Sequence, residues 1–439
     1  MSASPKGKPK AGSRTIRVDY LPRVEGEGRL LLQIENGKVQ VAEFGIFEPP
    51  RFFEALLRGR SFREAPDITA RICGICPVAY ITSASNALES ILGIQPTPGI
   101  RALRRLLYCG EWIESHALHV FLLHLPDFLG FPDAITMAAK HGDLVKKALH
   151  IKKVGNGIVT CLGGREIHPV GARVGGFYKA PTRASLQALL PGLRTGRAYT
   201  LEALEALSGI PFPDLERDVE FVAMQHPEEY PMAEGRIVSS KGLDIDVCDY
   251  DRYFAEEHVQ RSNALHSRVK GRGAYLTGPL ARFNLNFERL SPDVQKAARQ
   301  AKIPVPCLNP FKSILVRLVE TLQAFDDAVR IIESYEPPAP PFVDAPVRAG
   351  KGWGVSEAPR GILVHRYTID AEGTIQDAKI VPPTAQNQLA MEEDLTALAP
   401  DLLSMPIEQA TVRAEQALRN YDPCISCATH FLNLRIERR

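Results

Sequence analysis

The 439-residue sequence lacks the features that direct a protein to a membrane, a nucleic acid or the secretory pathway. No run reaches the roughly 18 apolar residues that a transmembrane helix requires. Lysine and arginine number 53 against 51 aspartates and glutamates, so the net charge of +2 gives no reason to expect a nucleic acid or an anionic membrane as partner. Residues 1–14 are basic but lack the apolar core of a signal peptide, and are typical of a disordered tail. We therefore expect a cytoplasmic protein.

The sequence also lacks internal repeats, a heptad pattern and the motifs of nucleotide-binding proteins. Its glycine-rich stretches match neither a phosphate-binding loop nor a dinucleotide fingerprint, so no nucleotide site is expected on this chain. Apolar residues make up 45% of the chain and charged residues 24%, as in a globular protein. We expect one α+β domain over residues 15–430, mainly α, with a core bundle of long helices and peripheral β hairpins.

Apolar residues at helical spacing predict the long buried helices of this bundle. A β hairpin is predicted around Asn36-Gly37, which is the strongest short hairpin signal, and a second around residues 371–373. Pro191-Gly192 predicts an interruption between two helical segments. The main predicted helices span residues 80–94, 100–128, 133–153, 184–190, 198–207, 311–335 and 389–420.

Four of the eight cysteines form two Cys-x-x-Cys pairs, Cys73/Cys76 and Cys424/Cys427. In a large chain of this composition, such pairs favour metal or redox chemistry over a disulfide framework. The pairs lie roughly 350 residues apart, whereas those of a zinc ribbon lie about 15–20 residues apart. Four thiolates suit soft or borderline ions such as nickel, iron and zinc, so a structural zinc stays open as an alternative. The remaining cysteines are single and are expected to be buried structural residues: Cys109, Cys161, Cys248 and Cys307.

The residues around the two pairs resemble a known family. Arg71–Cys76 and Asp422–His430 together resemble the two metal-binding signatures of the large subunit of nickel-iron hydrogenases. Further blocks follow in the family's order from about residue 20 to residue 430: Arg23-Val24-Glu25-Gly26, Arg51-x-x-Glu54, Gly163-Gly164-Arg165 with His168-Pro169, Ala358-Pro359-Arg360-Gly361 and Val381-Pro382-Pro383-Thr384.

By this resemblance, the four thiolates hold a nickel. Cys73 and Cys424 are its terminal ligands, and Cys76 and Cys427 bridge it to an iron that also carries carbon monoxide and cyanide. Such a centre cleaves H2 heterolytically and passes a proton to a nearby base. The resemblance thus implies a hydrogenase large-subunit fold and reversible conversion of H2 into protons and electrons.

The resemblance also assigns roles to residues beside the centre. Glu25 is the first proton relay and takes the proton from the sulfur of Cys424. Arg360 lies over the open coordination position, and Pro359 contributes its rigid ring to the pocket wall. Thr384 donates a hydrogen bond to a cyanide ligand, whose nitrogen needs a donor when it is buried.

Glu54 and His430 resemble the protein ligands of a second, isolated ion, magnesium or iron, near the C-terminus. In the family an endopeptidase commonly cuts the chain after the residue that corresponds to His430. We therefore expect residues 431–439 to be removed during maturation.

Two departures from the family's pattern indicate a branch within it. Many relatives have histidine at the position of Tyr80 and aspartate at that of Ser115. The residues found here resemble the cytosolic, cofactor-coupled branch, which delivers electrons to NAD(P) or a deazaflavin. Because no further cysteine set could hold iron–sulfur clusters, we expect an iron–sulfur small subunit, with diaphorase-type subunits that bind flavin and NAD(P).

Two other functions stay open at the level of sequence. A hydrogen-sensing hydrogenase subunit would carry the same metals with slow turnover. A structural-metal relative of the quinone-site subunit of respiratory complex I would keep the fold, but that subunit lacks the four cysteines.

Overall fold

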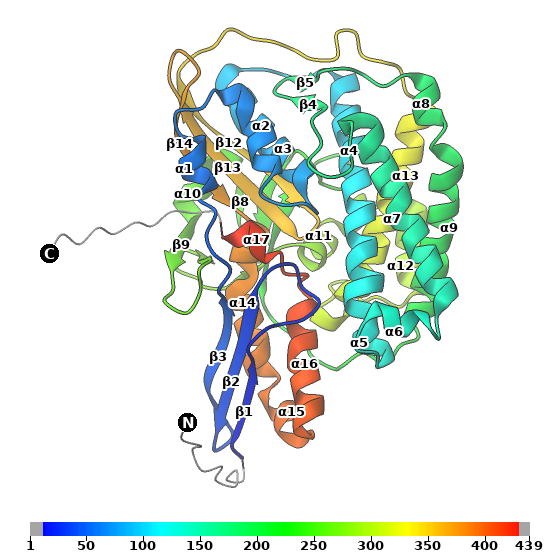
Figure 1. Ribbon diagram of the computed structural model, residues 1–439, viewed down its shortest axis with the longest axis vertical. Coiled ribbons are helices and arrows are strands. Elements are labelled where there is room, and N and C mark those ends of the chain that lie inside the picture. The colour runs from blue at the N-terminus through cyan, green and yellow to red at the C-terminus, as the bar shows by residue number, and fades with distance from the viewer. Residues whose placement is uncertain (1–11, 430–439) are drawn as a thin grey trace, which may run out of the picture.

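The computed structural model describes residues 12–429, with a helical bundle on one side and small sheets on the other (Figure 1). Predictions about residues 1–11 and 430–439, including the ligand role of His430 and the cleaved extension, therefore lie outside the described residues. Strand β1 begins at Arg14, within the segment that was predicted as tail. No helix in the described range is long and apolar enough to cross a membrane.

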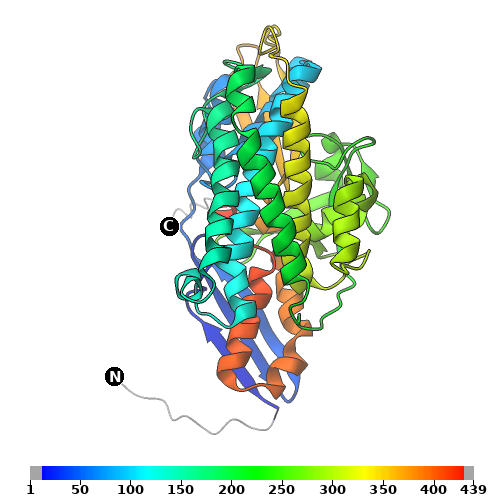
Figure 2. The same ribbon diagram turned by 90° about the vertical axis from the view of Figure 1, so that its right-hand side faces the viewer.

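Two helices that are buried along most of their length form the centre of the bundle. They carry the densest apolar patterns of the sequence, as predicted for core helices. Two partly exposed helices pack against them and against each other, and Figure 2 shows all four running side by side. The central helices are α4 (Pro98–Ala117) and α13 (Ser313–Glu333), and the outer ones are α7 (Gly142–Gly163) and α9 (Leu190–Leu207).

Helices α4 and α7 touch backbone to backbone at Gly110 and Gly155. A Cβ atom on Gly155 would lie 2.7 Å from the Gly110 carbonyl oxygen, so only glycine fits there. Helix α7 runs through Gly155 and ends at Gly163, ten residues beyond the predicted end at 153. Glycine lowers helix propensity, and the packing that it permits overrides that cost.

The predicted helix over residues 100–128 is not regular throughout. After α4, residues Leu118–His124 form a π-helical segment before α5 (Leu125–Leu129). The Leu125 N–H donates to the Val120 carbonyl, five residues back, which is the hydrogen-bond spacing of a π-helix. Pro126 has no N–H to donate, so a wider turn is tolerated here.

The predicted interruption at Pro191-Gly192 is wrong, because α9 begins at Leu190 and runs through both residues. Proline is tolerated in the first turn of a helix, where its missing N–H would have no partner in any case. The preceding segment forms the short helix α8 (Arg183–Gln187).

The hairpin predicted around Asn36-Gly37 is confirmed. Its strands β2 (Gly28–Glu35) and β3 (Lys38–Ile46) pair antiparallel, and β1 (Arg14–Val18) adds to β2. Asn36 and Gly37 have φ values of 52° and 74°, the left-handed conformation that a tight two-residue hairpin turn requires.

The second predicted hairpin is also present, but it belongs to a three-stranded sheet of order β12-β13-β14. Strand β12 was missed, since its glycines at 350, 352 and 354 obscure a strand pattern. Those glycines let the strand pack closely on α3 (Pro77–Leu92). The bounds are β12 Gly350–Ala358, β13 Gly361–Ile369 and β14 Ile375–Val381.

The other strands form one four-stranded sheet, of order β11-β6-β7-β8, and two small pairs, β9–β10 and β4–β5. Their bounds are β4 Ala172–Arg173, β5 Gly176–Phe177, β6 Glu220–Gln225, β7 Arg236–Ser239, β8 Asp244–Ile245, β9 Phe254–His258, β10 Leu265–Val269 and β11 Tyr275–Leu276.

The remaining helices are mostly short and connect these layers. The segment 389–420, predicted as helical, is divided among α14, α15 and α16, and α14 begins earlier, at Pro383. The bounds are α1 Phe53–Leu57, α2 Ala65–Ala70, α6 Ala134–Ala138, α10 Tyr250–Tyr253, α11 Pro279–Asn286, α12 Pro292–Gln300, α14 Pro383–Ala397, α15 Ala399–Ser404, α16 Ile407–Arg419 and α17 Ile425–Ala428.

The main apolar core includes residues from both ends of the described chain. It extends from Ile16 in β1 to Ala428 in α17, and it contains all four cysteines of the two pairs. The mixed α+β architecture, mainly helical with peripheral hairpins, agrees with the predicted fold class.

Candidate metal centre

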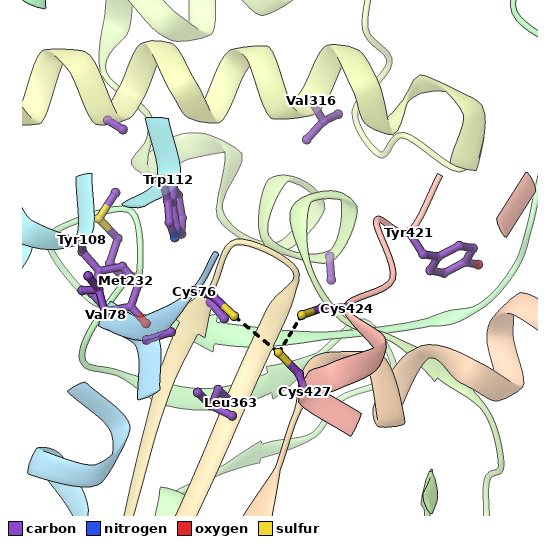
Figure 3. Packing of buried hydrophobic residues seen from close by; sticks show 14 of the residues in the cluster. Cys76, Val78, Tyr108, Trp112, Met232, Val316, Leu363, Tyr421, Cys424 and Cys427 are labelled. Carbon is purple, nitrogen blue, oxygen red and sulfur yellow. Dashed lines mark hydrogen bonds between the residues drawn. The ribbon is translucent and has the colours of Figure 1, made fainter. Parts of the chain in front are cut away.

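The two Cys-x-x-Cys pairs meet in the core. Their four sulfur atoms all lie within 4.8 Å of one another, and each side chain is buried. The Sγ atoms of Cys73 and Cys424 are 3.4 Å apart, and those of Cys76 and Cys427 are 3.6 Å apart. Figure 3 shows Cys76 of the first pair pointing toward Cys424 and Cys427 of the second. Within the described residues, this is the one group of three or more His, Cys, Asp or Glu side chains placed to hold a metal.

The first pair lies where α3 begins. The backbone N–H groups of Ile75 and Cys76 each donate to the Cys73 sulfur over 3.3 Å, and Pro77 then starts the helix. Glu111, a buried residue of α4, accepts hydrogen bonds from Val78 N (2.6 Å) and Ala79 N (3.1 Å). This carboxyl group satisfies two N–H groups of the first turn and fixes the helix that follows the cysteines.

Arg51 joins the two cysteine segments directly. Its guanidinium donates to the Ile72 carbonyl (2.6 Å) and to the Ser426 carbonyl, which precede Cys73 and Cys427. Its backbone N–H donates to the Thr429 carbonyl over 2.7 Å. The sequence placed Arg51 in a matched block, but its role as a link between distant segments could not be read from its position.

The charge state of the thiols is set by their burial and by one another. Burial alone raises the pKa of the Cys73 thiol, but hydrogen bonds from the other three thiols and the charge of Arg360 hold that pKa well below its usual range. Burial raises the pKa of the Cys424 thiol well above that range. The cluster therefore favours a thiolate in a dry site, and thiolate sulfur is a ligand for soft and borderline metals. The four residues thus fit a nickel site.

Glu25 lies against the second pair. Its Oε2 atom accepts hydrogen bonds from the Cys424 thiol (3.2 Å) and from Ser426 N (3.0 Å). Its own carbonyl accepts from Ile425 N (2.9 Å), so the backbone of Glu25 forms a β-bridge with Cys424. Burial and the nearby Cys73 raise the pKa of this carboxyl group, against hydrogen bonds from Ser426 and Cys424 that lower it.

Arg360 lies in the turn between β12 and β13, beside the cysteine cluster. Ala358 pairs with Gly361, so Pro359 and Arg360 form the tip of the β12–β13 turn. The buried guanidinium donates from Nε to the Asp422 carbonyl (2.7 Å) and from Nη2 to Asp422 Oδ1 (3.1 Å).

Asp422 is a site residue that the sequence prediction missed. It has a left-handed backbone (φ 52°), is buried, and holds Arg360 beside the cysteines through its carboxylate and its carbonyl. Its place two residues before Cys424 was a signal that could have found it. Ser115, at a position where the sequence departs from the family, lies 3.5 Å from Arg360 Nη1.

Thr384 contacts the second pair from the first turn of α14. Its hydroxyl oxygen accepts a hydrogen bond from Cys424 N over 2.9 Å, which leaves the hydroxyl hydrogen available to donate. Tyr80 is buried in α3, and the thiols of Cys427 and Cys76 add to burial in raising the pKa of its phenol well above the usual range.

Glu54 lies outside the cysteine cluster, on α1 next to β14. Its Oε1 atom accepts a hydrogen bond from Ile380 N over 2.8 Å, and burial raises its pKa to about 7. Its predicted partner His430 is outside the described residues, so the second ion site stays a prediction.

The prediction that the four single cysteines are buried holds for two of them. Cys109 and Cys307 are buried, whereas Cys161 is half-buried and Cys248 is exposed. Cys248 lies in the short 3-10 turn Val247–Asp249, which follows the edge strand β8.

Comparisons with known proteins agree with this geometry. The family model of nickel-dependent hydrogenases matches residues 51–147 and 270–430. The alpha subunit of sulfhydrogenase 2 of Pyrococcus furiosus is 34% identical over 422 residues, which cover 95% of this chain and 100% of that protein. The beta subunit of the NAD-reducing hydrogenase HoxS of Cupriavidus necator is 27% identical, with 96% of this chain and 95% of that protein covered.

A solved structure extends the similarity to three dimensions. An NAD+-reducing [NiFe]-hydrogenase in its H2-reduced state matches with a TM-score of 0.86 and 28% identity, covering 95% of this chain and 100% of that chain. The family model and the identity along almost the whole chain show that this protein belongs to the nickel-dependent hydrogenase family, as the large subunit that cleaves H2.

Proposed function

We propose that Cys73, Cys76, Cys424 and Cys427 hold the nickel–iron centre at which this chain cleaves H2. The observation that carries the proposal is the approach of four buried sulfur atoms to within 4.8 Å of one another. Cys73 and Cys424 would hold the nickel alone, and Cys76 and Cys427 would hold both the nickel and the iron that carries carbon monoxide and cyanide in this family. When bound, the centre supplies a Lewis-acidic site that polarises H2 toward heterolytic cleavage.

In this proposal Glu25 moves the proton. The 3.2 Å contact between Glu25 Oε2 and Cys424 Sγ is short enough for direct transfer from the sulfur to the carboxylate. The raised pKa lets the buried carboxyl group take up a proton at a higher pH than an exposed glutamate does. The hydrogen bond from Ser426 N keeps the accepting oxygen aimed at the sulfur.

Arg360 supplies a fixed positive charge beside the thiolates. Asp422 orients its guanidinium with bonds to a carbonyl and a carboxylate, and burial keeps solvent from screening the charge. Pro359 precedes it in the same turn and lends that turn rigidity, and Thr384 offers its hydroxyl hydrogen to a diatomic ligand. We propose further that Glu54 and His430 hold a magnesium or iron ion at a separate site.

We propose that electrons leave through an iron–sulfur partner subunit that docks near the first cysteine pair. A Cβ atom on Gly74, between Cys73 and Cys76, would lie 3.9 Å from Ile167. The side chains of Ile167 and Val170 are 52% and 46% exposed. An exposed apolar surface therefore lies beside Gly74, the residue that follows Cys73. Docking there would keep the electron path short.

The electron acceptor that we propose is NAD(P), reached through diaphorase-type subunits that carry flavin. The support is the similarity, over almost the full length of both chains, to the subunit of an NAD-reducing hydrogenase. The overall match to an NAD+-reducing enzyme of known structure supports the same assignment. A cytoplasmic location is part of this proposal.

Infrared spectroscopy of the purified complex tests the metal assignment. We expect one carbonyl band and two cyanide bands that shift under H2, together with nickel and iron by elemental analysis. Zinc without such bands would contradict the proposal, and the four cysteines would then form a structural zinc site. Reduction of NAD+ or NADP+ by H2 in the same preparation tests the acceptor, and rapid turnover argues against a hydrogen sensor.

We also propose that maturation removes residues 431–439 by cleavage after His430. The chain is anchored up to Thr429, which is buried and bonded to Arg51. Intact-mass measurement of the active enzyme should show a chain that ends at His430. A retained Arg439 in active enzyme would contradict this.

A further inference from the structure

A fully buried arginine, Arg282 of α11, lies behind the turn that carries Arg360. Its side chain is 0% exposed, and its guanidinium stacks over the ring of Trp112 at 4.4 Å from the ring centroid. Glu320 of α13 accepts from Nε and Nη2 over 2.7 Å each, and Glu357 accepts from Nη1 over 2.9 Å. These bonds fix the plane of the guanidinium and compensate its charge.

The two remaining N–H groups of Arg282 go to the turn itself. Nη1 donates to the Ala358 carbonyl (2.8 Å), and Nη2 donates to the Pro359 carbonyl (3.0 Å). All five N–H donors of the guanidinium are therefore used, and two of them hold the two residues immediately before Arg360. A lysine has one nitrogen and cannot span both carbonyls and both carboxylates.

The N-terminal end of α11 holds the same turn from its other side. The Thr277 hydroxyl accepts from Ile362 N over 3.0 Å. Gly278 has φ 110°, and a Cβ atom there would lie 2.6 Å from the Arg360 carbonyl oxygen. The segment from Thr277 to Arg282 thus contacts the turn at residues 358 to 362 from two sides.

We propose that Arg282 is a positioning residue for Arg360: it fixes the β12–β13 turn so that the Arg360 guanidinium reaches Asp422 and the cysteine cluster. Arg282 does not touch the cysteines and acts through Arg360. The inference rests on the proposed role of Arg360 at the metal centre. Glu320 and Glu357 support it by holding Arg282, and Glu320 also accepts from Tyr230 Oη (2.8 Å).

The test compares single and double variants of the complete enzyme complex. Arg282→Lys should keep the charge but release the two carbonyls. Because a misplacement of about 1 Å at an active site costs about 10²-fold, turnover per bound nickel should fall by about that factor. Arg360→Lys should be similarly slow, and the double variant should be no slower than Arg360→Lys alone, because both changes remove one function. Tyr230→Phe, which removes one bond to Glu320 and no bond to the turn, is the matched control and should turn over normally.

Infrared positions of the carbonyl and cyanide bands provide a readout that loss of stability alone does not move. Arg282→Lys should shift these bands in the same direction as Arg360→Lys, and Tyr230→Phe should leave them unchanged. If Arg282→Lys does not yield folded enzyme, Glu357→Gln tests the same link, since the amide has one oxygen for the two donors, Arg282 Nη1 and Met224 N, that the carboxylate serves. That variant should also be slower than the Tyr230→Phe control, with no additional loss when combined with Arg360→Lys.

The outcomes separate the inference from the function on which it rests. Normal turnover and unshifted bands in Arg282→Lys, with Arg360→Lys slow, would overturn the positioning role alone. Additive losses in the double variant would overturn it as well, because Arg282 would then act independently. Normal turnover in Arg360→Lys would remove the proposed role of Arg360, and the positioning role with it.

Discussion

Glu25 shows how much a single contact decides at the scale of the residue. A carboxylate near the N-terminus of a chain is ordinarily a solvated surface group, but here its Oε2 atom lies 3.2 Å from the Cys424 sulfur. The Glu25 side chain reaches that position because its own backbone is bridged to Cys424. The sequence predicted this role only through the resemblance of its block to a family.

Replacement of this carboxylate should separate proton transfer from metal assembly. We expect Glu25→Gln to lower H2 oxidation by about 10²–10⁴-fold, the usual contribution of a general acid–base group. Nickel content and the infrared bands should persist, since the glutamine can still accept from Ser426 N. Glu48→Gln is the control, because Glu48 accepts a hydrogen bond from the Ser426 hydroxyl but has no hydrogen bond to a cysteine. Equal losses in both variants would contradict the relay.

A second residue-scale prediction concerns the dependence of stability on pH. Asp394 is buried and bonded to Arg217 (2.8 Å) and Tyr421 (2.9 Å), and burial raises its pKa from 3.8 to about 6 despite these partners. Between these two values the folded state holds a proton that the unfolded chain has released. The contribution of Asp394 to stability is therefore full below about pH 4 and is lost as the pH rises through about 6.

Asp394→Asn should accordingly flatten the stability profile over this range. The expected difference across the window is about 3 kcal/mol, measured by denaturant unfolding at several pH values. Glu393→Gln is the control, because Glu393 is an exposed neighbour that also contacts Arg217. A profile of Asp394→Asn that parallels the unmodified protein would count against the raised pKa.

At the scale of the element, the sequence predicted helices and hairpins where one local signal dominated. Asn36-Gly37 favours the left-handed backbone of a tight hairpin turn. The dense apolar residues at helical spacing in α4 and α13 predict buried helices. The failures at α7, α9 and β12 share one cause. Pro191-Gly192 predicted an interruption, and the glycines of α7 and β12 weaken the local helix or strand pattern, but each lies where a close approach or a first helical turn accommodates it.

The contact between α4 and α7 can be tested with two glycines of the same helix. Gly155→Ala places a Cβ atom 2.7 Å from backbone atoms of α4, so we expect a loss of about 1–3 kcal/mol from overpacking. Gly157→Ala meets its nearest neighbour, a leucine methyl group, at 3.5 Å. It should gain up to about 1 kcal/mol from helix propensity. Thermal or denaturant unfolding measures both, and the same sign for the two substitutions would contradict the packing described.

At the scale of the whole molecule, the site depends on contacts between segments far apart in sequence. Spacing and residue type predicted the four cysteines, and the resemblance predicted Glu25, Arg360 and Thr384. The roles of Asp422 and Arg51 were not predicted, because each depends on which carbonyl or guanidinium group the folded chain places next to that residue. Such partners are properties of tertiary packing and carry no local signal.

Removal of one metal ligand should loosen both distant segments together. We expect Cys427→Ser to lose nickel, to lower the free energy of unfolding by about 3–5 kcal/mol, and to reduce hydrogen-exchange protection at residues 71–76 and 422–429 at the same time. The core of the α4–α7 pair should stay protected. Cys248→Ser, at an exposed cysteine, should change none of these. Loss of protection in only one segment would argue against a shared site.

The distance in sequence between the two cysteine pairs has a consequence for the order of events during synthesis. At about 5–20 residues per second, the ribosome needs roughly 20–70 s to pass from the first pair to the second. During that time Cys73 and Cys76 are present without Cys424 and Cys427. Two thiolates alone do not discriminate among soft metal ions. The nascent chain therefore has to keep its first pair empty and reduced until the rest is made, so loading of the correct metals must follow translation of the second pair.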